Sequence, residues 1–517
     1  MYDAIIIGAG HNGLVCAAYL AKAGRKVLVL EANDRVGGAA ITRSFGTGFK
    51  VSAGAHLINL LDPVVIDELK LESHGLDLGQ KTLKTVSLSH KGQHLVIDGD
   101  QLTGQVSDED RSAFADYKAQ MTRFSRLLNK LHLRPPPRLK PGRLSDYLDL
   151  LRVGAGLRRL GQRDMRDFLR IAGINIYDVL EEHFDNELLK GALAFDAVLG
   201  NHLGPRSNGS VLNALHRSSG RINDDNGTFA SPPGGVGAVS EALAKAAVAL
   251  GAKIRTGAPV EQLMFNGDTA CGVRLQSGEQ IEAETVVSNA DPKRTFLDLV
   301  GARHLEAEFA QSIHRTRCSG NVAKLHLGLK SLPRFTELDP TLAGERLLIA
   351  PSADYLDLAF NQAKYGHCSD HPAMEITIPS VADPSLADEG HHVLSAIVQY
   401  APYRLKGGWE HAHEPFKKTL IDQLDQYAPG LSLQVISSEL LTPADIEAEF
   451  GITGGHWHHG EMTLDQAFML RPAPGAGRYA TPIDGLYLCG AGSHPGGGVM
   501  GLAGRNAAQT VLSGGKT

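Results

Sequence analysis

The chain has 517 residues, of which 43% are hydrophobic and 21% are charged. This composition allows a large buried core and argues against a wholly disordered chain. The formal net charge of −6 excludes a chain-wide basic footprint, so we expect no nucleic-acid partner. The five cysteines are far apart and no pair is spaced as C-x-x-C, which argues against a disulfide framework and against a dithiol reductase centre.

Neither a membrane-spanning segment nor a signal peptide is predicted. No apolar run approaches 18 residues, and the N-terminal residues lack a basic region and a cleavage site. We therefore expect a cytoplasmic protein, with contact at a membrane surface left open.

The first forty residues have the pattern of a βαβ unit. Residues 2–7 form a β-branched apolar run that predicts a buried parallel strand. A glycine motif follows directly, a helix is expected over residues 14–23, and residues 26–31 predict a second strand. Such a unit, with a glycine motif between strand and helix, is typical of dinucleotide-binding folds.

Each part of this motif has a physical role. Gly8 permits the tight turn, Gly10 lets the backbone approach a pyrophosphate, and Gly13 lets the helix pack closely on the strand. The helix N-terminus offers free N–H groups to an anion. Glu31, at the end of the second strand, is placed to accept hydrogen bonds from a ribose diol.

The residues after Glu31 indicate which dinucleotide binds. The pattern E-x-x-x-R-x-G-G runs from Glu31 through Ala32 and Arg35 to Gly37 and Gly38. It resembles the large superfamily of FAD-dependent oxidoreductases. The resemblance implies that FAD is the cofactor and that these residues lie along its pyrophosphate and ribityl chain. The arginine usual after the second glycine is absent.

A second glycine-rich block lies near the C-terminus. Residues 486–489 predict a buried strand, residues 490–498 a loop with few side chains, and residues 502–512 a helix. Backbone groups and a helix N-terminus again point toward something anionic.

This block and the N-terminal one together resemble the phytoene-desaturase-like branch of the superfamily, and within it the pyridine nucleotide-disulphide oxidoreductase domain-containing protein 2 group. The resemblance rests on the string G-A-G-S-H-P-G-G-G-V, which runs from Gly490 to Val499. It implies that Gly490, Ala491, Gly498 and Val499 contact the flavin, with the Val499 N–H facing its pyrimidine edge. Many relatives have an acid where Ala491 stands, so the ribityl contact here must come from the backbone.

The expected fold is α/β, with a Rossmann-type FAD-binding domain of the glutathione-reductase-like, amine-oxidase type. We expect residues 1–100, 225–300 and 451–517 to form this discontinuous domain. Residues 101–224 and 301–450 are expected to form an inserted mixed α+β substrate domain with a basic helical part.

Two positions in the middle of the chain are also implied to contact the cofactor. The resemblance places Val260 beside the adenine, through its backbone, and Asn289 near the dinucleotide. Residues 286–292 are expected to form a strand that leads into a turn, and residues 273–275 and 281–283 to form a hairpin.

The helical part of the substrate domain is strongly basic. From Lys118 to Arg170 there are fourteen Lys and Arg residues and four Asp residues, a local charge of +10. Leucines such as Leu148 and Leu151 recur there at near-helical spacing. A basic amphipathic stretch of this kind is able to lie on an anionic membrane surface. The alternative is a solvated helical face whose leucines pack inward.

Candidate acid–base groups gather just before the closing glycine loop. We expect His456, Trp457 and His459 to form a wall beside the flavin. Ordinary packing and a metal site remain the alternatives for this cluster, although its ligands lie on one short segment without a tetrahedral partner set. Further candidates in the same stretch and elsewhere are His458, Glu461, Asp465, His56 and His494.

The resemblance implies hydride transfer between the flavin N5 and a C–H bond of an extended apolar substrate of polyene or isoprenoid type. The alternatives are a flavin amine oxidase, a saturase or isomerase, and a non-catalytic flavoprotein. The triple glycine at residues 496–498 disfavours an amine oxidase. Oxygen or a quinone is expected as the electron acceptor, and the oligomeric state is left open.

Overall fold

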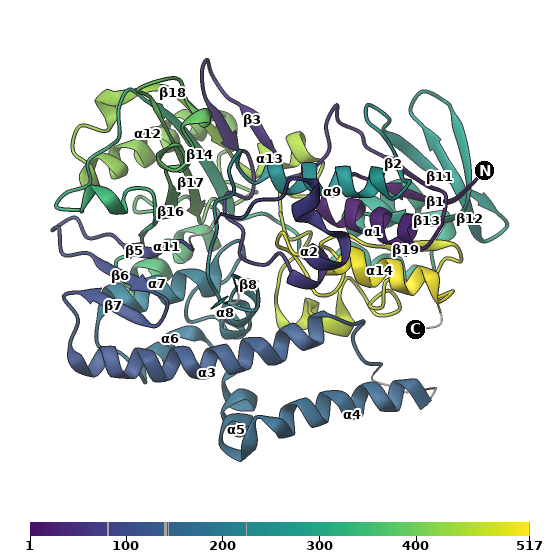
Figure 1. Ribbon diagram of the computed structural model, residues 1–517, viewed down its shortest axis with the longest axis horizontal. Helices are drawn as coiled ribbons and strands as arrows, with labels where there is room; N and C mark the ends of the chain where they lie inside the picture. Colours follow the sequence, from purple (N-terminus) through teal and green to yellow (C-terminus); the bar gives the residue numbers. More distant parts are fainter. Residues whose placement is uncertain (80–81, 139–141, 143, 224, 516–517) are drawn as a thin grey trace.

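The computed structural model describes residues 1–79, 82–138, 142, 144–223 and 225–515. Two large sheets, each with its own helices, organise the chain. Figure 1 shows both chain ends beside the first sheet, on the right, and the second sheet on the left.

The first sheet has seven strands, in the order β10-β2-β1-β13-β12-β11, with β19 pairing with β13. Its central strands are parallel and largely buried, which explains their unbroken runs of valine, isoleucine and leucine. The strands are β1 (Tyr2–Ile7), β2 (Val27–Leu30), β10 (Lys253–Arg255), β11 (Val260–Asn266), β12 (Thr269–Leu275), β13 (Gln280–Ser288) and β19 (Leu486–Leu488).

Three helices rich in small residues cover one face of this sheet: α1 (His11–Lys22), α9 (Gly237–Ala249) and α14 (Leu502–Leu512). Helix α1 packs between the other two, so nearly all of its side chains are buried. A Cβ at Gly504 would lie 2.1 Å from the Asn12 carbonyl oxygen. Glycine there lets α14 approach the first turn of α1 and brings the two glycine motifs together.

The expected hairpin is present, but the strand expected from residue 286 is not separate from it, because residues 286–288 belong to the same strand as residues 281–283. Strand β13 is one strand of nine residues. Its first half pairs antiparallel with β12, and its second half pairs parallel with β1 and β19. One strand therefore joins the antiparallel extension to the parallel core, and its polar residues face solvent only in the first half.

The second sheet has eight strands in the order β18-β14-β17-β16-β15-β5-β6-β7. Its central strands are buried on both faces, because helices cover one side and the first domain and further helices cover the other. The strands are β5 (Thr85–Ser87), β6 (Leu95–Asp98), β7 (Gln101–Gly104), β14 (Val322–Leu329), β15 (Arg346–Ile349), β16 (Ala373–Thr377), β17 (His392–Gln399) and β18 (Val435–Leu441).

The remaining elements connect the two sheets or cover them. The helices are α2 (Pro63–Leu69), α3 (Asp108–His132), α6 (Ile176–Glu181), α7 (Glu187–Val198), α8 (Ser210–Arg217), α10 (Ala307–Arg315), α11 (Ala353–Lys364), α12 (Trp409–Tyr427), α13 (Pro443–Phe450) and a π-helix (Arg294–Val300). Short two-stranded pairs are β3 (Thr42–Ser44) with β4 (Lys50–Ser52) and β8 (Arg221–Ile222) with β9 (Asp225–Asn226).

The structure moves both domain boundaries expected in the N-terminal half. The boundary at residue 100 cuts the β6–β7 hairpin, and β5 already pairs with β15 of the second sheet. The second domain therefore begins before Thr85. The boundary after residue 224 falls inside the β8–β9 pair, and residue 224 itself lies outside the described residues.

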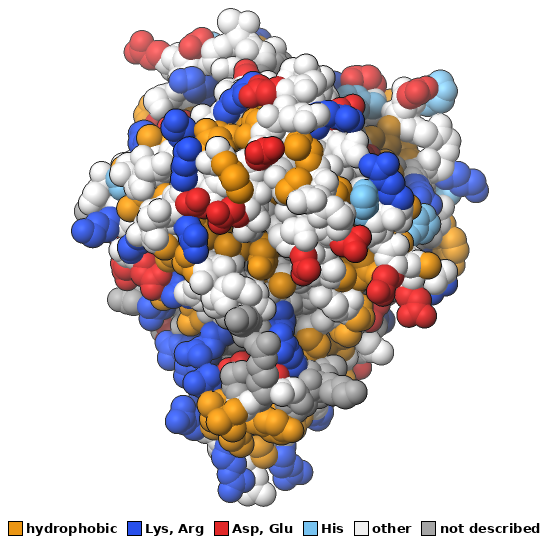
Figure 2. Space-filling model, turned by 90° about the vertical axis from the view of Figure 1, so that its right-hand side faces the viewer, with side chains coloured by type: hydrophobic (Ala, Val, Ile, Leu, Met, Phe, Trp, Pro, Cys, Tyr) orange, Lys and Arg blue, Asp and Glu red, His pale blue; other side chains and the backbone are white. Residues whose placement is uncertain are grey.

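Two helices of the basic segment form an arm beneath the second domain. These are α4 (Leu144–Arg159) and α5 (Gly161–Ile171), which lie below α3 in Figure 1. Figure 2 shows hydrophobic side chains gathered between Lys and Arg side chains at this narrow lower end. In the described part of the chain, no helix combines the length and apolar character needed to cross a bilayer.

Candidate active site

A cavity of about 570 Å³ lies where the carboxyl ends of the parallel strands of the first sheet face the second domain. Ligands of α/β folds bind at this edge, because loops and helix N-termini converge there. The walls of the cavity come from both domains. Its lining includes the first glycine motif, the closing glycine loop and charged side chains of the second domain.

One end of the cavity is built from glycines and an open helix end. Gly8 and Gly37 adopt φ values of +93° and +123°, which favour glycine. Helix α1 begins after Gly10 without a side-chain cap, and Gly10 and His11 line the cavity. The Gly37 N–H donates to the Ala9 carbonyl at 2.8 Å and so fixes the second glycine pair, which ends at Gly38, against the motif.

The carboxylate of Glu31 lies at the end of β2, as expected. It accepts hydrogen bonds from the N–H groups of Ala9 at 2.7 Å and Asn33 at 3.0 Å. Ala32 and Val260 line the same stretch of the cavity.

Asn289, just after β13, lines the cavity next to the glycine motif. An ideal Cβ on Gly10 would lie 2.7 Å from the Asn289 side-chain nitrogen. Glycine at position 10 therefore lets the Asn289 side chain lie against the glycine motif.

The closing loop reaches the cavity through Ala491, Gly498 and Val499. Two histidines fix its backbone. Nε2 of His11 lies 3.0 Å from the Gly498 carbonyl oxygen, and Nε2 of His216 lies 2.9 Å from that of Gly497. Burial lowers the pKa of both histidines to about 4, although these hydrogen bonds oppose the shift. Each ring is therefore neutral and donates from Nε2.

Four of the expected site residues lie outside the cavity lining. Gly13 is a packing position, because a Cβ there would lie 2.2 Å from the Gly8 carbonyl oxygen. Gly490 packs on the backbone of Asn289 in the same way. The exposed Arg35 side chain pairs with Asp34 at 3.0 Å and does not face the cavity. The fourth is His456.

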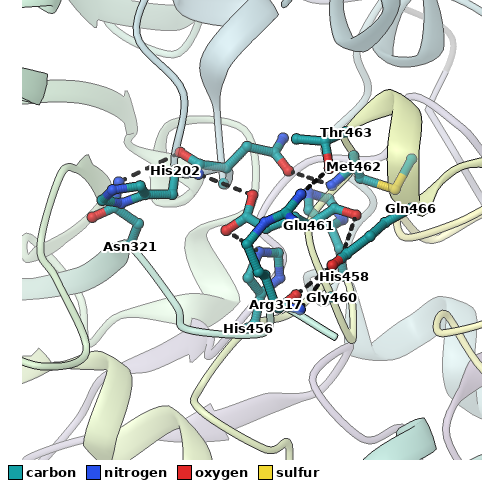
Figure 3. Close-up of polar contacts among 12 residues, drawn as sticks. His202, Arg317, Asn321, His456, His458, Gly460, Glu461, Met462, Thr463 and Gln466 are labelled. Carbon is teal, nitrogen blue, oxygen red and sulfur yellow. Dashed lines mark hydrogen bonds and ion pairs between the residues drawn. The ribbon is translucent and has the colours of Figure 1, made fainter. Parts of the chain in front are cut away.

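The expected wall before the closing loop is built from Trp457, His458 and His459, which all line the cavity. His456 instead points away and lies 3.3 Å from a carboxylate oxygen of Glu461. Figure 3 shows Glu461 between His456 and His202. The Glu461 carboxylate accepts a hydrogen bond from the backbone N–H of His202 at 3.0 Å. Glu461 and His456 therefore hold the segment together.

Of the other acid–base candidates, His56 lines the cavity, whereas Asp465 and His494 do not. Asp465 forms an exposed ion pair with Arg317 at 2.8 Å. His494 is buried, and its Nε2 lies 3.2 Å from the Leu131 carbonyl oxygen. Among the described residues, no group of three or more potential metal ligands comes together.

Arg471 ties the histidine segment to the closing loop. Its fully buried guanidinium donates to the carbonyl oxygens of Ala491 at 2.9 Å and Glu461 at 2.9 Å, and also contacts that of His458. Burial lowers the pKa of Arg471 to about 10, with Glu461 opposing. Carbonyl oxygens thus surround its positive charge, and its hydrogen bonds hold the closing loop against the histidine segment.

A buried ionic network forms the second-domain end of the cavity. Glu375, on β16, contacts Arg217 at 2.6 Å, Arg346 at 2.5 Å and His56 at 3.1 Å. Asp196, on α7, contacts both arginines, with a distance of 2.8 Å to Arg217. Asp196 and Glu375 are thus neutralised by guanidinium groups.

A lysine lies behind this network. Lys324, on β14, is fully buried, and its Nζ has no hydrogen-bond partner in the described part of the chain. Burial lowers the pKa of Lys324 well below its ordinary range, and Glu375 opposes this shift. Burial and Lys324 together lower the pKa of His56 to about 4. His56 is therefore neutral and is able to donate from Nε2 to Glu375.

The family of this chain follows from comparison with known proteins. Residues 13–512 match the family of flavin-containing amine oxidoreductases. This chain belongs to that family. The oxidoreductase is 36% identical to the rat (Rattus norvegicus) protein named pyridine nucleotide-disulfide oxidoreductase domain-containing protein 2, over 99% of this chain and 93% of the relative.

Two further relatives have more specific names. A limonene dehydrogenase polypeptide of Castellaniella defragrans is 27% identical over 98% of this chain and 94% of its own length. The lycopene-forming phytoene desaturase of Pantoea ananas is 27% identical over 98% of this chain and 97% of its own length. Among solved structures, cyclohexylamine oxidase of Brevibacterium oxydans superposes with a TM-score of 0.61 at 18% identity, with complete coverage of both chains. That likeness supports the fold alone.

The oxidoreductase uses FAD, and the cavity fits this cofactor. The glycine cradle and the uncapped N-terminus of α1 suit the pyrophosphate, and Glu31 suits a ribose. Nδ1 of His458 and of His459 has no partner in the described chain although both rings are buried. Buried polar atoms of this kind are usually satisfied by a ligand or by water.

Several cavity residues could not be found from sequence motifs. His11 occupies a variable position inside the glycine motif, and that position was the only signal that it lines the cavity. His216, Arg217 and Glu375 lie on elements that carry no motif. Only the tertiary fold brings them to the cofactor edge.

The buried histidines predict that the oxidoreductase is labile in acid. Burial lowers the pKa of each of eight histidines below the value of about 6.5 that an unfolded histidine has. These are His11, His56, His132, His216, His326, His458, His459 and His494. The unfolded state therefore binds more protons below about pH 6.5, and stability falls as pH falls from there toward about 4.

Each histidine contributes a slope of up to about 1.4 kcal/mol per pH unit in this window. Denaturant unfolding with saturating FAD at pH 7.5, 6.5 and 5.5 measures the slope. We expect the unfolding free energy to fall more between pH 6.5 and 5.5 than between pH 7.5 and 6.5. A flat profile down to pH 5.5 would contradict the burial of these neutral rings.

Proposed function

We propose that this FAD-dependent oxidoreductase moves hydride between the flavin N5 and a C–H bond of an extended apolar substrate, as a dehydrogenase or desaturase of isoprenoid-like compounds. One observation carries the proposal. The second-domain end of the cavity combines an apolar surface with carboxylates that are already paired with arginines.

The apolar surface lies next to the closing loop. Leu57 and Leu60 come from the segment before α2, Leu199 follows α7, Ile397 lies on β17, and Met462 follows the histidine segment. Apolar side chains from four separate parts of the chain thus line the cavity. Such a surface binds hydrocarbon by excluding water, at roughly 25 cal/mol per Å² of apolar area buried.

The same end is poorly suited to an amine. An ammonium group needs a free carboxylate or an aromatic cage. Asp196 and Glu375 are both occupied by guanidinium groups. Apart from histidines, the described lining has two aromatic side chains, Trp457 and Phe450, and no tyrosine.

The names of two relatives support the same substrate class. Phytoene desaturase and limonene dehydrogenase are named for isoprenoid hydrocarbons, and each aligns with nearly the whole chain. The cyclohexylamine oxidase likeness, at 18% identity, gives the fold without the substrate.

The residues of the chain have separate tasks in this reaction. When bound, FAD supplies the hydride acceptor. The backbone at Gly498 and Val499, fixed by His11 and His216, holds the cofactor edge, and the apolar surface orients the substrate. Desaturation also releases a proton from the adjacent carbon. His459 lines the cavity, and its neutral ring is the proposed acceptor for this proton. Oxygen or a quinone is the proposed oxidant.

Anaerobic reduction of the bound flavin tests the proposal. Loss of absorbance near 450 nm is followed with isoprenoid hydrocarbons in vesicles and, separately, with primary and secondary amines. We expect bleaching by an isoprenoid and a product with one more double bond. His459→Ala is expected to keep FAD and to slow the bleaching.

Each other outcome has a definite meaning. Bleaching by amines alone would establish an amine oxidase and overturn the proposal. If neither class bleaches the flavin, oxidation of these compounds is refuted, and a saturase, an isomerase or a non-catalytic flavoprotein becomes the better account. Unchanged bleaching in His459→Ala with FAD bound would remove His459 from the chemistry.

A further inference from the structure

The arm formed by α4 and α5 has a surface that the flavin site does not use. Helix α4 contacts α3 and α5, and it lies apart from the two sheets (Figure 1). One side of α4 therefore faces α3, and another side is open to solvent.

The open side of α4 is apolar. Leu144, Tyr147, Leu148 and Leu151 are 78%, 54%, 44% and 66% exposed. Their spacing of three, four and seven residues places them on one helical face. Soluble monomers rarely expose a contiguous stripe of large apolar side chains, and such stripes mark interaction surfaces. The leucines of α4 do not all pack inward, so the solvated-face alternative is not what the structure shows.

Exposed arginines follow this stripe along the arm, at the end of α4 and on α5. Arg158, Arg159, Arg163 and Arg166 are exposed, and none has a carboxylate within ion-pair distance in the described chain. The acids of the arm face the other way. Asp164, for example, pairs with Arg123 of α3 at 2.5 Å. The outer surface of the arm is therefore both apolar and cationic.

A groove of about 610 Å³ separates α3 from α4. Its lining pairs an apolar floor, which includes Leu127 and Val153, with a basic rim. Lys130, Arg134 and Arg159 of the rim have no carboxylate within ion-pair distance in the described residues. The groove therefore combines apolar and basic side chains, as the outer surface of the arm does.

We propose that this arm docks on an anionic lipid bilayer. The stripe would enter the interfacial region, and the arginines would contact lipid phosphates, as in amphipathic helices that lie in the plane of a membrane. A second copy of the chain fits less well, because an isologous contact would bring the arginines of one arm against those of the other. Charge complementarity therefore favours anionic lipid.

The arm is joined to the flavin site through α3. The Leu131 and His132 carbonyls at the end of α3 contact His494 of the closing loop at 3.2 Å and Asn506 of α14 at 2.9 Å. A bilayer bound at the arm would thus lie on the same side as the end of α3 that supports the loop. The docking itself does not depend on the substrate proposed above.

Vesicle sedimentation of the FAD-loaded protein tests the docking. Vesicles of phosphatidylglycerol with phosphatidylcholine are expected to carry the protein down, and pure phosphatidylcholine vesicles to carry at least about tenfold less. High salt is expected to weaken binding to the anionic vesicles, because it screens the arginines. Equal binding to both vesicles, or no binding to either, would overturn the proposal.

Matched variants locate the surface. Leu148→Ser with Leu151→Ser is expected to reduce binding at least about fivefold while the flavin absorbance is retained. The control is Leu358→Ser with Leu433→Ser, which changes leucines that are 68% and 81% exposed on the second domain. An equal loss in both pairs, or no loss in the first, would contradict the assignment to α4.

A fluorescent variant separates docking from unfolding of the arm. In Tyr147→Trp, the new tryptophan is expected to shift to shorter wavelength with anionic vesicles and to be quenched by brominated lipids. A tryptophan that stays unquenched would place the arm outside the bilayer. Dimerisation that is lost in the α4 variant, without vesicle binding by the unchanged protein, would assign the stripe to a second copy instead.

Discussion

Replacing Glu375 with alanine is expected to lower the unfolding free energy by about 3–5 kcal/mol, the usual cost of breaking a buried ion pair. The carboxylate is 1% exposed and contacts Arg217, Arg346 and His56. Without it, the buried guanidinium of Arg346 and the partly buried one of Arg217 share the single carboxylate of Asp196. The loss comes mainly from the charge left unpaired.

The same group predicts a pH dependence. Burial alone would raise the pKa of Glu375, but Arg217 and Arg346 lower it well below its ordinary value. A carboxyl whose folded pKa is lowered stabilises the fold above its unfolded pKa of about 4.3, and this contribution is lost as pH falls below it. The difference in unfolding free energy between Glu375→Ala and the unchanged protein should therefore disappear in strong acid.

Denaturant unfolding at pH 7.5 measures the effect. The matched control is Glu279→Ala, which removes an exposed carboxylate paired with Arg255, and it is expected to change stability too little to detect. A Glu375→Ala protein as stable as this control would show that the network is not buried as described.

Gly10→Ala is expected to weaken FAD binding. The added Cβ would lie 2.7 Å from the side-chain nitrogen of Asn289 and would occupy the space in which the backbone approaches the pyrophosphate. We expect at least about tenfold weaker binding, or about 1.4 kcal/mol. Titration of the apoprotein with FAD, followed by flavin fluorescence, measures this change.

The matched control is Gly154→Ala on the arm. No atom lies within 4 Å of its ideal Cβ, and alanine is the better helix former. This variant should keep its FAD and its thermal midpoint, whereas Gly10→Ala should lose the stability that bound FAD supplies. Full FAD content in Gly10→Ala would remove Gly10 from the cofactor site.

The parts predicted well from the sequence are those whose function is local. The glycine motif works through neighbouring residues, so Gly8, Gly10 and Glu31 line one cavity, and their contacts with the cofactor stay predictions. The helix expected over residues 502–512 has those same bounds, because a glycine loop precedes it and small residues pack it on α1.

What the sequence could not predict depends on contacts between distant segments. The domain boundary was misplaced because β5 pairs with β15, where Thr85 and Arg346 are 261 positions apart. His456 and His459 have the same residue type and are three positions apart, yet only His459 faces the cavity. Which of them does so is decided by Glu461 and Arg471, which fix the segment.

The stripe on α4 illustrates a similar limit. Leucine spacing indicated an amphipathic helix but not which face stays free. That depends on α3, which pairs with the acidic side of the arm through Arg123 and leaves Leu148 and Leu151 outside.

The most direct test of the proposed function is the deuterium isotope effect on anaerobic flavin reduction. An isoprenoid that bleaches the flavin is compared with the same compound deuterated at the carbon that loses hydride, in a stopped-flow experiment at 450 nm. If a C–H bond breaks as the flavin is reduced, the deuterated compound should react severalfold more slowly. Equal rates, or no reduction by any isoprenoid, would contradict hydride transfer from an apolar substrate in this cavity.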